Sequence, residues 1–127
     1  MAGQFYDNPE RTLVHVNVAD LTAAADIATV VGPAGKVGRV TRLGAGLTTA
    51  VTVADTVITL DEVTPALAAP PTLTIPFTGS AIGDNVENTR AELNTFTEIP
   101  ADTVLQLNCD GGATAGAGSV TLQIDWY

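Results

Sequence analysis

The sequence predicts an all-β fold, and three observations support that prediction. Short runs rich in Val, Ile, Thr and Leu recur along the chain, and β-branched residues suit pleated, half-buried strands. Clusters of Gly, Pro, Asn and Asp separate these runs. No stretch keeps the i, i+3, i+4, i+7 apolar spacing of an amphipathic helix for long. The pattern therefore favours an antiparallel β-sandwich of the jelly-roll-like type, with long loops and an extended N-terminal arm.

The chain of 127 residues has the length of one domain. We divide it into an N-terminal arm, residues 1–11, and a single β-sandwich domain, residues 12–127. The arm is polar, with the aromatic pair Phe5 and Tyr6 before a turn signal at Asp7-Asn8-Pro9. It is either a frayed terminus or an arm that becomes ordered on a partner, with the two aromatic rings as anchors.

The strands are predicted from alternation of apolar and polar residues and from β-branched content. They are Thr12–Val18, Asp26–Val31, Lys36–Leu43, Leu47–Val53, Thr56–Leu60, Thr72–Phe77, Thr103–Cys109 and Ser119–Trp126. Gly44-Ala45-Gly46 is expected to break the chain between the third strand and the fourth. One helical turn is predicted in 19–25, with Asp20 as N-cap. A second is predicted in 84–93, where Arg90 would reach Glu87 at i, i+3.

The charge of the chain limits its partners. The formal net charge is −9, with only 5 Lys and Arg. The one local basic cluster is Lys36, Arg39 and Arg42, and three solvated charges beside a turn are its simplest interpretation. DNA and anionic membranes would repel such a chain, so neither nucleic acid nor membrane is expected as a partner, whereas a basic protein surface would attract it.

The residues that carry enzyme chemistry are scarce. His15 and Cys109 are the only residues of their types, too few for a zinc site or an internal disulfide. Gly79-Ser80-Ala81-Ile82-Gly83 matches the nucleophile-elbow pattern, but that motif requires a strand–turn–helix context. Asp84, Asn85, Glu87 and Asn88 lack the spacing of a calcium loop. We therefore expect no catalytic residue, no cofactor and no metal, and not an enzyme.

Targeting signals are not recognised in this sequence. Residues 1–11 lack the basic and apolar regions of a secretory signal, and no apolar run is long enough to span a bilayer. The expectation is a protein made in a cytoplasm and used wherever its assembly ends up.

One segment carries a resemblance to a known family. Its residues are Val31, Pro33-Ala34-Gly35-Lys36-Val37, Arg39-Val40, and then Ala54-Asp55-Thr56-Val57-Ile58-Thr59. Leu73-Thr74-Ile75-Pro76, Gly79–Asp84 and Cys109-Asp110-Gly111-Gly112 continue the pattern, which covers roughly residues 30–125. This order of strands and turns resembles the decoration, or cement, proteins of tailed-phage capsids, which have a jelly-roll-like β-sandwich.

The resemblance implies a homotrimer that binds the major capsid protein on the outer surface of the virion head, after synthesis in the host cytoplasm. The residues expected to contact the capsid are Phe5, Tyr6, Asp7, Asn8, Pro9, Glu10, Arg11, Asp84, Asn85, Glu87 and Arg90. Trp126 and Tyr127 are expected at a subunit interface. The alternative is a recognition module, such as a head fibre or a glycan- or host-binding β-sandwich, that uses the loops 63–71 and 110–118.

Overall fold

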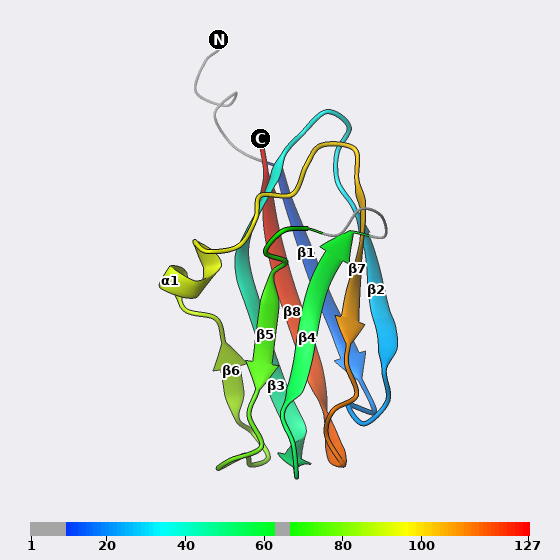
Figure 1. Ribbon diagram of the computed structural model, residues 1–127, viewed down its shortest axis with the longest axis vertical. Coiled ribbons are helices and arrows are strands. Elements are labelled where there is room, and N and C mark those ends of the chain that lie inside the picture. The colour runs from blue at the N-terminus through cyan, green and yellow to red at the C-terminus, as the bar shows by residue number, and fades with distance from the viewer. Residues whose placement is uncertain (1–9, 63–66) are drawn as a thin grey trace.

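The computed structural model describes residues 10–62 and 67–127, which form two stacked antiparallel sheets (Figure 1). The elements are β1 (Glu10–Val18), β2 (Ala25–Val31), β3 (Gly38–Thr52), β4 (Thr56–Glu62), β5 (Thr72–Ile75), β6 (Asn85–Glu87), α1 (Arg90–Leu93), β7 (Val104–Cys109) and β8 (Ala115–Trp126). The strand orders are β1-β8-β3-β6 in the first sheet and β2-β7-β4-β5 in the second. The predicted all-β sandwich is confirmed.

The pairing of the strands follows one rule. The first pairs with the last, β1 with β8, then β2 with β7, β3 with β6 and β4 with β5. This long two-stranded ribbon is folded over so that β8 also pairs with β3 and β7 with β4. Such an order of eight antiparallel strands in two sheets is a jelly roll. Among the described residues, no helix is both long and apolar enough to cross a bilayer.

The core lies between the sheets and follows the alternation of each strand. In β8, Val120, Leu122 and Ile124 point inward and are buried. Leu105 and Leu107 of β7 face them from the other sheet, whereas Val104 is exposed, as predicted. Cys109 is buried at the end of β7, and burial raises the pKa of its thiol. The period-2 pattern of the sequence therefore specifies the core-facing side of these strands.

The break predicted at Gly44-Ala45-Gly46 is wrong, because β3 runs unbroken through it. Here β6 joins the sheet edge, with Gly44 opposite Glu87 and Gly46 opposite Asn85. A Cβ placed at Gly44 would lie 2.5 Å from Cγ of Glu87. The glycines are therefore positions of close side-chain approach within a strand.

Two further expectations differ from the structure. Residues 19–24 form a turn instead of a helix, since the Asp20 carboxylate accepts the backbone N–H of Thr22, two residues ahead. The Gly-rich segment 110–118 is only partly a loop, because β8 begins at Ala115. Small residues there allow β8 to pair with β3 along its whole length.

Candidate functional site: the outer face of the β1-β8-β3-β6 sheet

The outer face of the first sheet carries rows of polar side chains, because every second residue of its strands points away from the core. Pairing in register places these residues side by side. From one end of the sheet to the other, the rows are Arg11, Asp125 and Arg39; Leu13, Gln123 and Arg42; His15, Thr121, Gly44 and Glu87; and Asn17, Ser119, Gly46 and Asn85. We call this surface the polar face.

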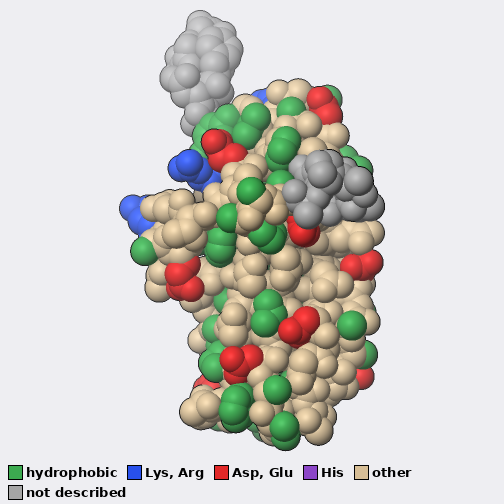
Figure 2. Space-filling view, in the orientation of Figure 1, with side chains coloured by type: hydrophobic (Ala, Val, Ile, Leu, Met, Phe, Trp, Pro, Cys, Tyr) green, Lys and Arg blue, Asp and Glu red, His purple; other side chains and the backbone are tan. Residues whose placement is uncertain are grey.

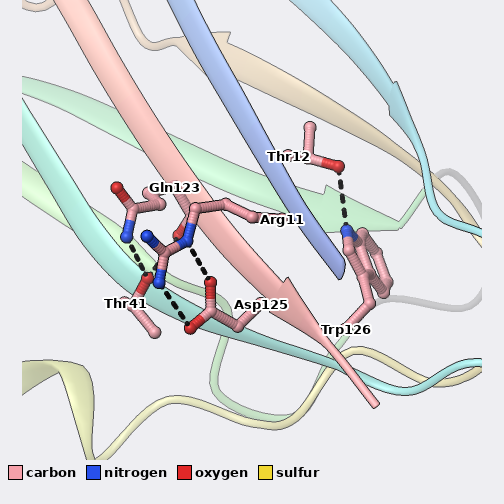
Figure 3. A network of polar contacts seen from close by, with 6 residues as sticks. All are labelled: Arg11, Thr12, Thr41, Gln123, Asp125 and Trp126. Atoms are coloured by element: carbon pink, nitrogen blue, oxygen red, sulfur yellow. Dashed lines mark hydrogen bonds and ion pairs between the residues drawn. The ribbon is translucent and has the colours of Figure 1, made fainter. Parts of the chain in front are cut away.

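An ion pair anchors the first row (Figure 3). Nε and Nη2 of Arg11 donate to the two carboxylate oxygens of Asp125 over 2.8 and 3.2 Å. Asp125 is only 7% exposed, so its charge is held largely out of water beside the guanidinium. The hydrogen bonds to Asp125, together with its charge, raise the pKa of Arg11. The pair therefore couples β1 to β8 where both lie at one end of the sandwich.

Uncharged hydrogen bonds join β8 to β3 next to this pair (Figure 3). Nε2 of Gln123 donates to Oγ1 of Thr41 over 3.1 Å. The pairing of β3 with β8 shifts between Val40 and Arg42, so Thr41 is the extra residue of a bulge. This bulge increases the local twist of β3 beside Arg39 and Arg42.

The middle rows of the polar face hold a second ion pair, between Arg42 Nε and the Glu87 carboxylate. The predicted pair of Glu87 with Arg90 is therefore wrong, because Glu87 in β6 lies against β3. Nδ1 of His15 is 2.9 Å from Oγ1 of Thr121. These residues line a hollow of about 320 Å³ with Asn85 and Ser119, above the two glycines of β3.

A larger hollow of about 540 Å³ lies where α1 meets β3. Arg39, Val40 and Thr41 line it from β3, and Arg90, Leu93 and Asn94 from α1. The short helix is held by a capping box: Oγ1 of Thr89 accepts the N–H of Glu92, and the Glu92 carboxylate accepts the N–H of Thr89. These bonds lower the pKa of Glu92 and fix the turn that carries Arg90.

Charge is distributed unevenly between the two sheets. All five basic residues of the chain lie on or beside the polar face: Arg11, Lys36, Arg39, Arg42 and Arg90. The second sheet and the loops carry only acids among the described residues: Asp20, Asp26, Asp55, Asp61, Glu98, Asp102 and Asp110. Figure 2 looks onto the second sheet, where acidic side chains are spread out and blue ones occur only at the margins.

The predicted contact residues come together only in part. Phe5, Tyr6, Asp7, Asn8 and Pro9 lie outside the described residues. Glu10 and Arg11 belong to β1, so the arm boundary at residue 11 overlaps the first strand. Asn85 and Glu87 in β6 and Arg90 in α1 border the polar face, and the carboxylate of Asp84 caps the N–H of Ala81 nearby.

The expected interface residues at the C-terminal end separate. Trp126 is 1% exposed within the single chain, and its Nε1 donates to Oγ1 of Thr12 over 2.9 Å, so its indole belongs to the core and not to a subunit interface. Tyr127 is 59% exposed, and its backbone pairs with Val37. Only Tyr127 of the two is therefore available to a neighbour.

The sequence interpretation missed Asp125, Arg39 and the hollow that Arg39 shares with Arg90. The alternation of β8 already placed Asp125 on the polar side of its strand. Its partner Arg11 lies 114 positions away, and only the strand register reveals that neighbour.

Other parts of the surface were searched for a site. The described residues contain no group of three or more His, Cys, Asp or Glu that could hold a metal ion. Exposed apolar side chains occur at one end of the sandwich, Val53 after β3 and Phe77 and Ile82 after β5. The polar face remains the surface with the largest hollow. Comparisons with protein-family models, with curated proteins and with solved structures find no significant match for this chain.

Proposed function

We propose that this chain is a structural virion protein, a capsid decoration subunit that binds the outer surface of a phage head as a homotrimer and stabilises it. The observation that supports this most is the jelly-roll order of the strands, an architecture used by viral capsid domains and by lectins. This is an argument from fold, and it joins the resemblance in residues 30–125.

The uneven charge supports an orientation for such a subunit. The acidic second sheet would face solvent, and the polar face, where basic and acidic side chains balance, would lie toward the shell. Most side chains there are already hydrogen-bonded or ion-paired, so docking would order few of them. Three copies in a trimer multiply weak contacts into stable attachment.

The test uses heads of the source phage stripped of this protein. Light scattering after size-exclusion chromatography should give three times the 13.0 kDa of one chain. The protein should co-sediment with stripped heads and raise their melting temperature. A monomer that does not co-sediment would contradict the proposal.

The contribution of the arm needs a deletion that spares β1. Removal of residues 1–9 keeps Arg11 and its bonds to Asp125, whereas removal of residues 1–11 would not. We expect the 1–9 deletion to remain a folded trimer and to lose head binding. Unchanged head binding would reject the arm as a contact and leave the polar face as the contact surface.

A recognition module is the second candidate function, and the smaller hollow on the polar face favours it. Its lining of His15, Arg42, Asn85, Glu87 and Ser119 offers donors and acceptors of the kind that sugar hydroxyls use. A glycan array probed with the isolated protein tests this candidate. Glycan binding that is lost in Asn85→Ala would support it, and binding to stripped heads alone would exclude it.

A further inference from the structure

We infer that the hollow between β3 and α1 binds a carboxylate group, presented by an acidic side chain of a protein partner. We call it the Arg39–Arg90 pocket. The inference deepens the proposed function by naming the chemistry of the partner, and in that respect it rests on it. The pocket itself can be tested without phage heads.

The first argument is the pairing of the basic residues. Arg11 is bound to Asp125, Lys36 Nζ lies 3.1 Å from Glu10 Oε1, and Arg42 is bound to Glu87. Within 10–62 and 67–127, Arg39 and Arg90 have neither an ion pair nor a side-chain hydrogen bond. The two unpaired cations of an acidic protein line the same pocket.

The second argument is that the nearest acids are already engaged. Asp125 lies directly opposite Arg39 in the sheet, but Arg11 takes both of its oxygens. Glu92 lies two residues after Arg90, but its carboxylate accepts the N–H of Thr89 over 2.9 Å. An internal partner would have to leave these bonds, so an external anion meets little competition.

The shape of the pocket selects the kind of anion. At about 540 Å³ it is larger than a bare inorganic ion needs, and Val40 and Leu93 supply apolar wall beside the two guanidinium groups. A carboxylate can accept paired hydrogen bonds from a planar guanidinium while its aliphatic stem contacts that wall. Nucleic acid or an anionic membrane would bring many charges toward a chain of net charge −9, which opposes them.

The first experiment is an NMR titration of the ¹⁵N-labelled full chain with the peptide acetyl-Ala-Ala-Glu-Ala-Ala-amide. The Nε–Hε signals of Arg39 and Arg90 should shift, whereas those of the paired Arg11 and Arg42 should not. The same peptide with Gln in place of Glu should have no effect. Inorganic phosphate is titrated in parallel.

Two double variants with equal charge change provide the comparison. Arg39→Gln with Arg90→Gln should weaken peptide binding by about tenfold or more, the usual effect of losing a charged hydrogen-bond partner. Lys36→Gln with Arg42→Gln removes two cations that are already paired and should leave the affinity within about twofold. Equal loss in both variants would show a mere dependence on net charge and overturn the inference.

The remaining outcomes are also decisive. No shift at Arg39 and Arg90 with the Glu peptide would overturn the inference. Binding of phosphate without the peptide would assign the pocket to a small anion and reject a partner's side chain.

Co-sedimentation with stripped heads then separates the two proposals. If the native protein binds heads but the Arg39/Arg90 variant binds them equally well, the pocket is not the contact and the decoration role stands. If the native protein binds the Glu peptide but not the heads, the decoration role fails and the pocket stands.

Discussion

Arg11 in β1 donates two hydrogen bonds to the nearly buried carboxylate of Asp125, directly opposite it in β8. Arg11→Gln should lower the urea midpoint of unfolding, because the carboxylate would keep its charge in a site with little water. Arg11→Gln combined with Asp125→Asn should recover part of that loss, since the double variant buries no charge.

The measurement is a double-mutant cycle from urea unfolding curves at neutral pH. Arg42→Gln is the matched control, because its ion pair with Glu87 is exposed on both sides and should contribute little. Losses that simply add in the Arg11 and Asp125 double variant would show that the two residues are not coupled.

Space for an indole ring explains a second pair of residues, Gly38 and Trp126. A Cβ placed at Gly38 would lie 2.6 Å from Cζ3 of the ring, and one at Gly32 would lie 2.5 Å from it. Gly38→Ala should therefore cost about 1–3 kcal/mol of unfolding free energy through overpacking. Chemical denaturation followed by Trp126 fluorescence measures the loss.

A second glycine of β3 provides the control for Gly38. A Cβ at Gly46 would lie 3.2 Å from Oδ1 of Asn85, a side chain that can move. Gly46→Ala should cost clearly less than Gly38→Ala. Equal losses for the two variants would mean that the loss of glycine, and not contact with the ring, governs stability.

Backbone strain is concentrated at Val53, which has a φ of 74° although it is β-branched and 70% exposed. Asn tolerates this left-handed conformation better, so Val53→Asn should raise the free energy of unfolding by about 1 kcal/mol. Val31→Asn is the control, because Val31 is 65% exposed in a regular strand. A thermal melt that shows Val53→Asn to be destabilised would contradict the strain interpretation.

Acid stability should depend on the turn at Asp20. Its carboxylate accepts the hydroxyl of Thr22 over 2.5 Å and the N–H of Thr22 over 2.8 Å, and these bonds lower the pKa of Asp20. The charged form is favoured in the folded state. Its contribution is therefore present above the unfolded pKa, about 4, and is lost as the pH falls through the lowered folded value.

Substitution at Thr22 tests this dependence. Thr22→Ala should move the pKa of Asp20 upward, toward its ordinary value, whereas Thr22→Ser keeps the hydroxyl and should retain most of the shift. A ¹³C NMR titration of the Asp20 carboxyl measures both. A pKa that is the same in the native protein and in Thr22→Ala would remove the hydroxyl as a cause.

Much of the strand layout was predictable from local pattern, and the polar face was not. The alternation in 119–126 correctly separates Val120, Leu122 and Ile124 from Thr121 and Gln123. The same pattern assigned Trp126 to an interface, because alternation does not say how large a cavity the fold provides for a ring. That cavity exists because Gly32 and Gly38, far from Trp126 in the sequence, lie against it.

The sequence by itself determined the all-β class, the inward faces of the strands and the acidic net charge, because a period of two and a composition are local properties. Tertiary structure alone decided that β1 pairs with β8, that every basic residue lies by one sheet, and that Arg39 and Arg90 share a pocket. Backbone hydrogen bonds are alike for any antiparallel neighbour, so which strands pair depends on the burial of the whole core.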